Sequence, residues 1–378
     1  MNTKKTNDWI FKLLFMFSLI SYNTTFAQTE FFHSKILYSE KQLDKFYSSM
    51  SMDSTQIYFN ANDYKLYAFN KKTDSINWSY YIANKTNETP KLYKNSIIVT
   101  HHFDEYNHKS IQINSKTGDP IQTLKINEIY NEPFFKNDIM YCNSISPEIG
   151  GAVLAYDLKK NDIVWKQFVA HGVMRQVYFK KDEIMANAEE NNWFKIGYDG
   201  VLKDTICKNK ASIFVENIKC VENFEILTAD YKIISEPFLS KNLGKYDNLV
   251  FKSNEKVTAL LGNENLLILG ANKKVVHTAN LNKLLLALDF GKNDYKTILK
   301  IENSTVWFFY ENLLISFDYK NPENRQVYDL AKWNAHQILL EPDDSIAWLI
   351  SKNDGQLYGL NLIYLKKEQD AQKNINKK

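Results

Sequence analysis

Short polar turns that join two apolar segments recur at nearly constant spacing along the chain. The clearest example lies at residues 92–99, where an apolar pair, a polar turn centred on Asn95 and a short apolar run follow one another. The equivalent turn centres are Asp53, Asn95, Asn137, Lys181, Asn223, Asn263, Asn303 and Asp343. Because successive centres are 40 to 44 residues apart, the pattern indicates one supersecondary unit repeated eight times.

Each repeat contains four short segments rich in β-branched and aromatic residues. In the second repeat these segments span 97–100, 109–113, 121–126 and 133–135, and Asn, Asp, Gly and Pro separate them. Segments of this length and composition predict four antiparallel strands joined by hairpins. No helical pattern interrupts them, so the predicted fold class is all-β.

The second strand of most repeats is apolar without alternation, which requires both of its faces to be buried. These runs are 57–59, 97–99, 139–141, 184–186, 266–268, 306–308 and 347–349. Four-stranded sheets stacked around an axis bury both faces of each sheet, so we predict an eight-bladed β-propeller. The alternatives are a seven-bladed ring, with the weak fifth repeat at 211–255 looped out, and a linear solenoid.

Both ends of the repeat array suggest how the ring closes. The eighth repeat has no clear fourth strand, whereas residues 34–39 form an apolar segment with no local partner. We therefore expect this N-terminal strand to become the outer strand of the last blade and to cover its edge. The charged segment 366–378 is expected to be a disordered tail.

The N-terminus has the organisation of a secretory signal. Lys4 and Lys5 precede the apolar run 13–20, and the small residues Thr25 and Ala27 suit cleavage before Gln28. We thus predict a signal peptide at 1–27, one propeller domain at 28–365, and an extracytoplasmic protein that is periplasmic or secreted. The apolar run is too short to span a membrane as a helix, so no membrane span is expected.

The charge of the chain bears on the class of partner it can bind, and its cysteines bear on disulfide formation. The chain has 47 basic and 44 acidic residues, and its only arginines are Arg175 and Arg325, so we predict no nucleic-acid binding. Cys142 lies in an apolar run and is expected to be a buried hydrophobic residue. Cys207 and Cys220 are near enough in sequence to form a disulfide, which spacing alone leaves open.

Two repeats share a longer motif. Residues 67–78 (YAFNKKTDSINW) align without gaps to residues 154–165 (LAYDLKKNDIVW), and Asn114, Thr117 and Gly118 fit the same frame. This motif resembles the PQQ-like repeat of the quinoprotein dehydrogenase superfamily, with its alanine, aspartate, Thr-Gly turn and docking tryptophan. The chain is similar to the non-catalytic, BamB-like propellers of bacterial envelopes.

The resemblance implies a propeller fold without the chemistry of the dehydrogenases. Those enzymes hold a quinone with a calcium ion, a catalytic aspartate and, in many, adjacent cysteines. This chain has no adjacent cysteines and no set of residues that aligns with the calcium ligands. We therefore expect no cofactor and no enzymatic activity.

One face of the predicted ring collects unusual residues in the loops after the second strands and between blades. The candidates are His101, His102, Asp104, Glu105, His108, Glu148, His171 and Arg175. Imidazoles and carboxylates together can bind zinc, although alternation sends His101 and His102 to opposite sides of their strand. A solvated hairpin is the plainest alternative. We assign these residues to a candidate partner-binding rim, with no metal site.

The sequence thus favours a monomeric propeller that acts as a scaffold for an envelope or secreted protein. The competing hypothesis is a small-ligand or metal-dependent binding or enzyme site in the central funnel at the same face. A scaffold should expose aromatic or apolar residues at the rim, whereas an enzyme should gather titratable groups with shifted pKa values at the axis.

Overall fold

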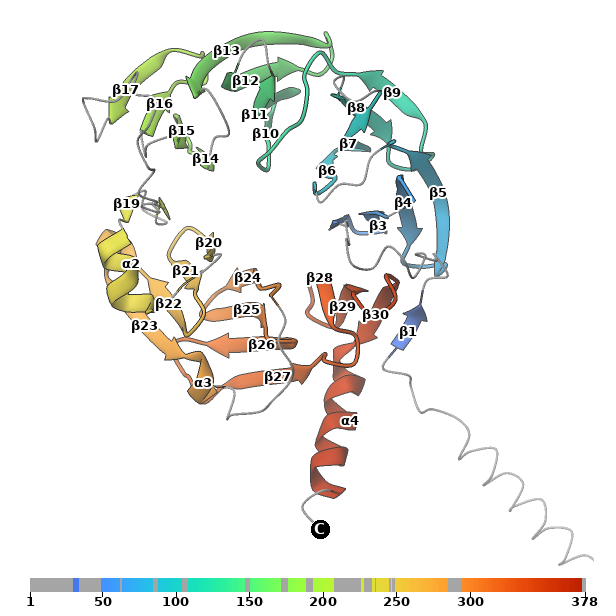
Figure 1. The fold of residues 1–378 in the computed structure, drawn as a ribbon, viewed down its shortest axis with the longest axis vertical. Coiled ribbons are helices and arrows are strands. Elements are labelled where there is room, and N and C mark those ends of the chain that lie inside the picture. The colour runs from blue at the N-terminus through green and yellow to red at the C-terminus, as the bar shows by residue number, and fades with distance from the viewer. Residues whose placement is uncertain are drawn as a thin grey trace, which may run out of the picture.

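The computed structural model describes residues 30–33, 49–61, 63–83, 88–103, 108–146, 150–170, 176–187, 193–206, 226–227, 233–234, 236–244, 246, 249–284 and 294–375. These residues form seven four-stranded antiparallel sheets and one two-stranded sheet. The four-stranded sheets are the blades of a ring (Figure 1), so the predicted all-β propeller is confirmed. The segment 1–27, Cys207 and Cys220 lie outside the described residues. No helix in the described ranges is both long and apolar enough to cross a membrane.

The strands follow the chain order from the innermost to the outermost position in the first six blades. Blade 1 consists of β2 (Met50–Met52), β3 (Gln56–Asn60), β4 (Lys65–Asn70) and β5 (Ser75–Tyr81). Blade 2 consists of β6 (Lys91–Tyr93), β7 (Ser96–His102), β8 (His108–Asn114) and β9 (Pro120–Thr123). Blade 3 consists of β10 (Phe134–Lys136), β11 (Ile139–Ser146), β12 (Gly150–Asp157) and β13 (Asp162–Ala170). Blade 4 consists of β14 (Gln176–Phe179), β15 (Ile184–Asn187), β16 (Trp193–Ile196) and β17 (Leu202–Ile206). Blade 5 consists of β20 (Val250–Ser253), β21 (Thr258–Leu261), β22 (Asn265–Leu269) and β23 (Val275–Asn280). Blade 6 consists of β24 (Thr297–Glu302), β25 (Thr305–Tyr310), β26 (Leu313–Asp318) and β27 (Arg325–Asp329). Blade 7 is β28 (Ala335–Leu340), β29 (Ile346–Ser351) and β30 (Leu357–Asn361), completed by β1 (Glu30–His33).

The unalternating apolar runs are buried on both faces, as expected for strands between neighbouring blades. Every residue of β3 is buried, and so are all but the first residues of β25 and β29. Successive hydrophobic clusters join adjacent blades: one includes Tyr58 and Trp78 of blade 1 with Ile97 and Ile113 of blade 2. Cys142 belongs to another such cluster and is a free thiol, and burial raises its pKa.

The ring has seven four-stranded blades, which is the alternative count rather than the eight that the even spacing favoured. The described part of the fifth repeat forms no four-stranded blade of its own: it contains the short pair β18 (Ile226–Leu227) and β19 (Ile233–Ile234), the helix α2 (Glu236–Leu243) and β20, which is the first strand of blade 5. Leu239 and Leu243 of α2 pack on Leu260 and Leu267 of blade 5. The helix therefore covers apolar surface of blade 5 and lies beside β22 in Figure 1.

The phase of the sixth repeat also needs correction. Residues 266–268 belong to β22, the third strand of blade 5, and not to a second strand. The turn between the first two strands of that blade lies at Asn254, whose side chain accepts hydrogen bonds from the backbone N–H groups of Lys256 and Val257. Asn263 instead lies between β21 and β22.

An N-terminal strand closes the last blade, as predicted, but the strand is β1 at residues 30–33. It pairs antiparallel with β30, with Phe32 opposite Gly359 and His33 opposite Tyr358. Residues 34–39, to which the sequence analysis assigned this role, lie outside the described residues. The outer edge of β30 is therefore covered by the opposite end of the chain.

A repeated backbone turn follows the third strand of the blades. Asn70, Asn114, Asp157 and Asp318 each accept hydrogen bonds from the N–H groups two and three residues later. Asn361 makes the same contacts with Ile363 and Tyr364, but there the chain continues as the helix α4 (Leu362–Ile375). The same local cap thus begins a hairpin in four blades and a helix in the last.

The helix α4 shows that the expectation of a disordered tail is wrong for residues 366–375. Leu362 and Leu365 are buried in the cluster shared by blades 6 and 7. Farther along, the Gln369 side chain accepts a hydrogen bond from the Asp329 N–H at 3.2 Å and donates one to the Asp329 carbonyl at 2.9 Å. These contacts anchor a segment whose charge had suggested disorder.

Tryptophans on outer strands dock onto glycine turns of the following blade. The Trp78 indole donates to the Ser115 carbonyl at 2.9 Å and lies against Gly118, where an added Cβ would be 2.7 Å from the ring. Trp165 meets Gly200 in the same way and donates to the Tyr198 carbonyl at 3.0 Å. Both glycines have positive φ, so a side chain there would be strained as well as obstructed.

Candidate functional site

Three of the predicted rim residues, His101, His102 and His108, lie at one face of the ring, here called the histidine face. It comprises the turns between second and third strands and the connections between blades; the opposite face, called the turn face, carries the turns at Asp53 and Asn95. His102 pairs with His108 and His101 with Lys109 at the end of the β7–β8 hairpin. The structure therefore brings His101, His102 and His108 to the same end of blade 2. Asp104, Glu105, Glu148, His171 and Arg175 lie outside the described residues.

His101 is partly enclosed by aromatic rings. Its ring centroid is 4.5 Å from that of Phe103 and 6.2 Å from that of Tyr80. Burial lowers the pKa of His101, although a hydrogen bond involving the Tyr81 backbone opposes this effect. The side chain is thus favoured in its neutral form, which suits packing against aromatic neighbours.

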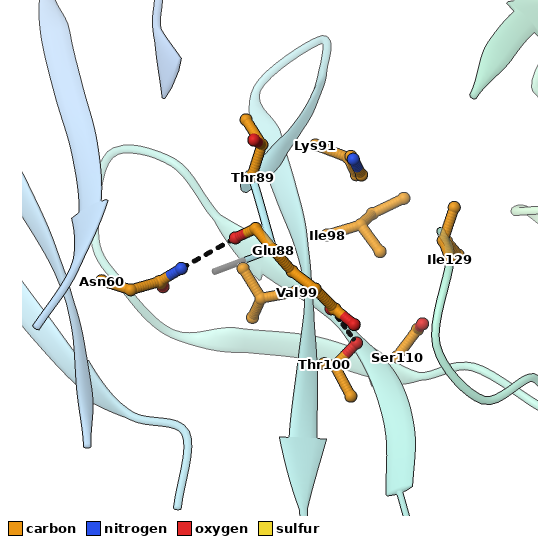
Figure 2. Close-up of a pocket in the computed structure, with 9 residues that line it drawn as sticks. All are labelled: Asn60, Glu88, Thr89, Lys91, Ile98, Val99, Thr100, Ser110 and Ile129. Atoms are coloured by element: carbon orange, nitrogen blue, oxygen red, sulfur yellow. Dashed lines mark hydrogen bonds between the residues drawn. The ribbon is translucent and has the colours of Figure 1, made fainter. Parts of the chain in front are cut away.

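A carboxylate that sequence analysis did not select lies at the centre of this part of the face. Glu88, in the connection between blades 1 and 2, lines a pocket with Asn60, Lys91, Thr100 and Ser110 (Figure 2). The Thr100 hydroxyl donates to Glu88 Oε2 at 2.6 Å, and Asn60 Nδ2 donates to the Glu88 carbonyl at 2.8 Å. Side chains of two blades therefore hold both the backbone and the carboxylate of this residue.

Burial raises the pKa of Glu88 to about 7. The charge of Glu128 acts in the same direction, whereas the Thr100 hydrogen bond and the Lys91 ammonium favour the ionised form. Glu88 thus changes charge near neutral pH. Its glutamate side chain carried no distinguishing sequence signal, because the effect depends on burial between two blades.

The connection between blades 2 and 3 forms the other wall of this region. The Tyr130 hydroxyl donates to Glu128 at 2.7 Å, and the Asn131 N–H donates to the Asn143 side-chain oxygen at 3.0 Å. The buried Lys91 lies 3.6 Å from the exposed Glu132 carboxylate. Asn143 has the role in blade 3 that Asn60 has in blade 1, since each lies on a second strand and fastens a connecting segment.

Five aromatic side chains are exposed at the histidine face of blades 1 to 3. They are between 40% and 57% exposed, and they are Tyr64, Tyr81, Phe103, Tyr130 and Phe168. Their positions follow from strand direction, because β5 and β13 end at this face and the turns after β3 and β7 lie there. We call these five residues the aromatic rim. The rings of Tyr64 and Tyr81 lie 6.5 Å apart.

The pocket beside Glu88 has room for little more than one water molecule. Its volume is about 10 Å³. Within the part of the chain that the structure describes, no three His, Cys, Asp or Glu residues are arranged to hold a metal ion. The polar groups around Glu88 therefore support the loops of the face rather than enclose a ligand.

In comparisons with known proteins, no protein-family model matches the chain, and no curated protein matches it.

Proposed function

We propose that this propeller is a protein-binding scaffold and that its histidine face contacts the partner. The observation that carries the proposal is the aromatic rim, which brings exposed rings from three consecutive blades to one face. Tyrosine and other aromatic residues are enriched in protein interfaces because they bury a large area with few rotatable bonds. Blades held rigid by buried strands present these rings at fixed positions.

The partner is an envelope or secreted protein in this proposal. The signal-like segment at 1–27 favours an extracytoplasmic location, and the resemblance to BamB-like propellers favours a role in assembly rather than catalysis. Docking of Trp78 on Gly118 and of Trp165 on Gly200 supports the PQQ-like repeat as the unit from which the ring is built. The small volume beside Glu88 favours a protein partner over a small substrate.

The test is replacement of three rim residues. We expect the variant Y81S/F103S/Y130S to lose its partner while it remains folded, because the three side chains are exposed and lie outside the buried clusters between blades. The measurement is chemical cross-linking in intact cells that make the protein, followed by capture and identification of cross-linked proteins by mass spectrometry.

A matched control alters apolar residues that are similarly exposed but lie at or just before the start of outer strands, away from the histidine face. Ile121, Val164 and Val201 provide such positions, and the variant I121S/V164S/V201S should retain the partner. Equal retention by both variants, or a natural chain that cross-links to no protein, would contradict the proposal.

A further inference from the structure

A second candidate site lies at the turn face between blades 6 and 7. It is an open groove of about 410 Å³. The lining residues used below are Trp307, Ser316, Gln326, Tyr328, Asp344 and Leu362. They come from three strands of blade 6, from the first turn of blade 7 and from the start of α4. This site does not rest on the proposed function, because it is on the opposite face from the aromatic rim.

The groove occupies the position at which a docking tryptophan sits elsewhere in the ring. In blade 1, Tyr58, Ala68 and Trp78 lie opposite one another across three neighbouring strands. In blade 6 the same row is Trp307, Ser316 and Gln326. Gln326 therefore replaces the tryptophan, and the exposed glutamine does not fill the volume of an indole.

The receiving side of the groove also corresponds to the Trp78 site. Trp78 donates to the carbonyl of Ser115, whose own N–H donates to the Asn95 carbonyl. In blade 7, the Leu362 N–H donates to the Ser345 carbonyl in the same way, so Leu362 is the equivalent of Ser115. There, however, the glycine turn is replaced by the first turn of α4.

A glutamine at this position does not by itself explain an open groove. Gln122 is the equivalent residue of blade 2, and its Nε2 donates to the Leu158 carbonyl of blade 3 at 2.7 Å. At the interface of blades 6 and 7, Gln326 Oε1 instead accepts a hydrogen bond from the Tyr328 hydroxyl at 2.5 Å. The side chain is thus held by its own blade.

The walls of the groove define what it can accept. Trp307 and Tyr328 are buried and stacked, with ring centroids 6.1 Å apart and an interplanar angle of 18°. Glu302, Asp343 and Asp344 bring three carboxylates to its edge. Lys300 forms ion pairs with Glu302 at 2.7 Å and with Asp344 at 3.0 Å, so one cation faces three anions. The groove is aromatic at its base and acidic at its edge.

We propose that this groove binds a tryptophan side chain of a partner polypeptide in which lysine or arginine flanks the tryptophan. The indole would occupy the volume that Trp78 fills at the interface of blades 1 and 2, against the row formed by Trp307 and Ser316. The basic neighbours would meet the excess of carboxylates at the edge. The partner thereby supplies in trans the docking residue that this interface lacks.

The test uses the peptide Lys-Trp-Lys with 5-fluorotryptophan, titrated with the full chain and followed by ¹⁹F NMR. We expect saturable binding to the natural chain. We also expect binding at least about tenfold weaker to Q326W, in which the chain's own indole fills the groove, a change of about 1.4 kcal/mol. The variant Q122W places a tryptophan at the equivalent position of blade 2 and should bind the peptide like the natural chain.

Two further measurements test whether the groove selects tryptophan and whether the loss of binding could come from misfolding of Q326W. S316F obstructs the groove from the third strand and should also weaken binding at least about tenfold, so the conclusion does not depend on Q326W alone. In a competition experiment, unlabelled Lys-Leu-Lys should not displace the fluorinated Lys-Trp-Lys peptide from the groove. The proposal is overturned if the natural chain does not bind Lys-Trp-Lys, if both groove variants bind it normally, or if Lys-Leu-Lys competes equally. Self-association of the natural chain that Q326W removes, without peptide binding, would overturn it in favour of a second copy.

Discussion

Replacement of Trp78 by alanine is expected to lower the free energy of unfolding by about 3–5 kcal/mol, as for other buried tryptophans. The indole lies in the apolar cluster between blades 1 and 2 and holds the Gly118 turn through its hydrogen bond to Ser115. Its removal leaves a cavity that the glycine turn does not fill. Equilibrium denaturation in urea, followed by circular dichroism, measures the effect.

Gln122→Ala is the matched control, because Gln122 occupies the same position in blade 2 but contributes a hydrogen bond rather than a ring. We expect it to cost about 1 kcal/mol. If W78A costs no more than Q122A, tryptophan docking does not hold the blades together.

Glu88 is expected to make the protein less stable as the pH rises through neutrality. Its pKa is raised from 4.5 to about 7 in the folded chain, so the folded state binds more protons than the unfolded state between these values. The stability associated with protonated Glu88 is complete below about pH 4.5 and is lost as the pH rises through 7. At about 1.36 kcal/mol for each pKa unit, the loss is roughly 3 kcal/mol.

Glu88→Gln isolates this effect because glutamine stays neutral and can still accept the Thr100 hydroxyl. The variant should exceed the natural chain in stability above pH 7, with the difference vanishing near pH 4.5, in urea denaturation repeated across this range. Glu323→Gln changes an exposed glutamate and should follow the natural pH profile. Parallel profiles for E88Q and the natural chain would show that Glu88 ionises without cost.

The sequence was sufficient for the ring because its main signal is local: buried second strands such as 57–59 are apolar without alternation. Blade count failed at the turn of Asn263. That turn joins β21 and β22, which are apolar apart from Thr258 and Asn265, so it has the same pattern as a turn between first and second strands. The residues around a turn do not show whether it joins the first and second strands or the second and third strands of a blade, because that depends on which strand lies nearest the axis.

The sites depended still more on three-dimensional contacts. Strand direction alone places His101, His102 and His108 at one end of a hairpin, and the structure has them there. Glu88 was not predicted because its raised pKa depends on burial between two blades. The groove beside Gln326 was not predicted because it becomes apparent only when the residues that lie opposite one another across the strands of blades 1 and 6 are compared. Gly200 was missed as a docking partner of Trp165 because its turn lacks the Thr-Gly pair.

Closure by β1 also sets the order in which the molecule can be completed. β1 precedes all the other described strands along the chain, and its partner β30 follows all of them. Contacts between such distant residues form slowly, because nearly the entire chain must be brought into a loop before they are made. The last blade cannot close until β30 has been synthesised, and any truncation before β30 leaves β1 without its partner.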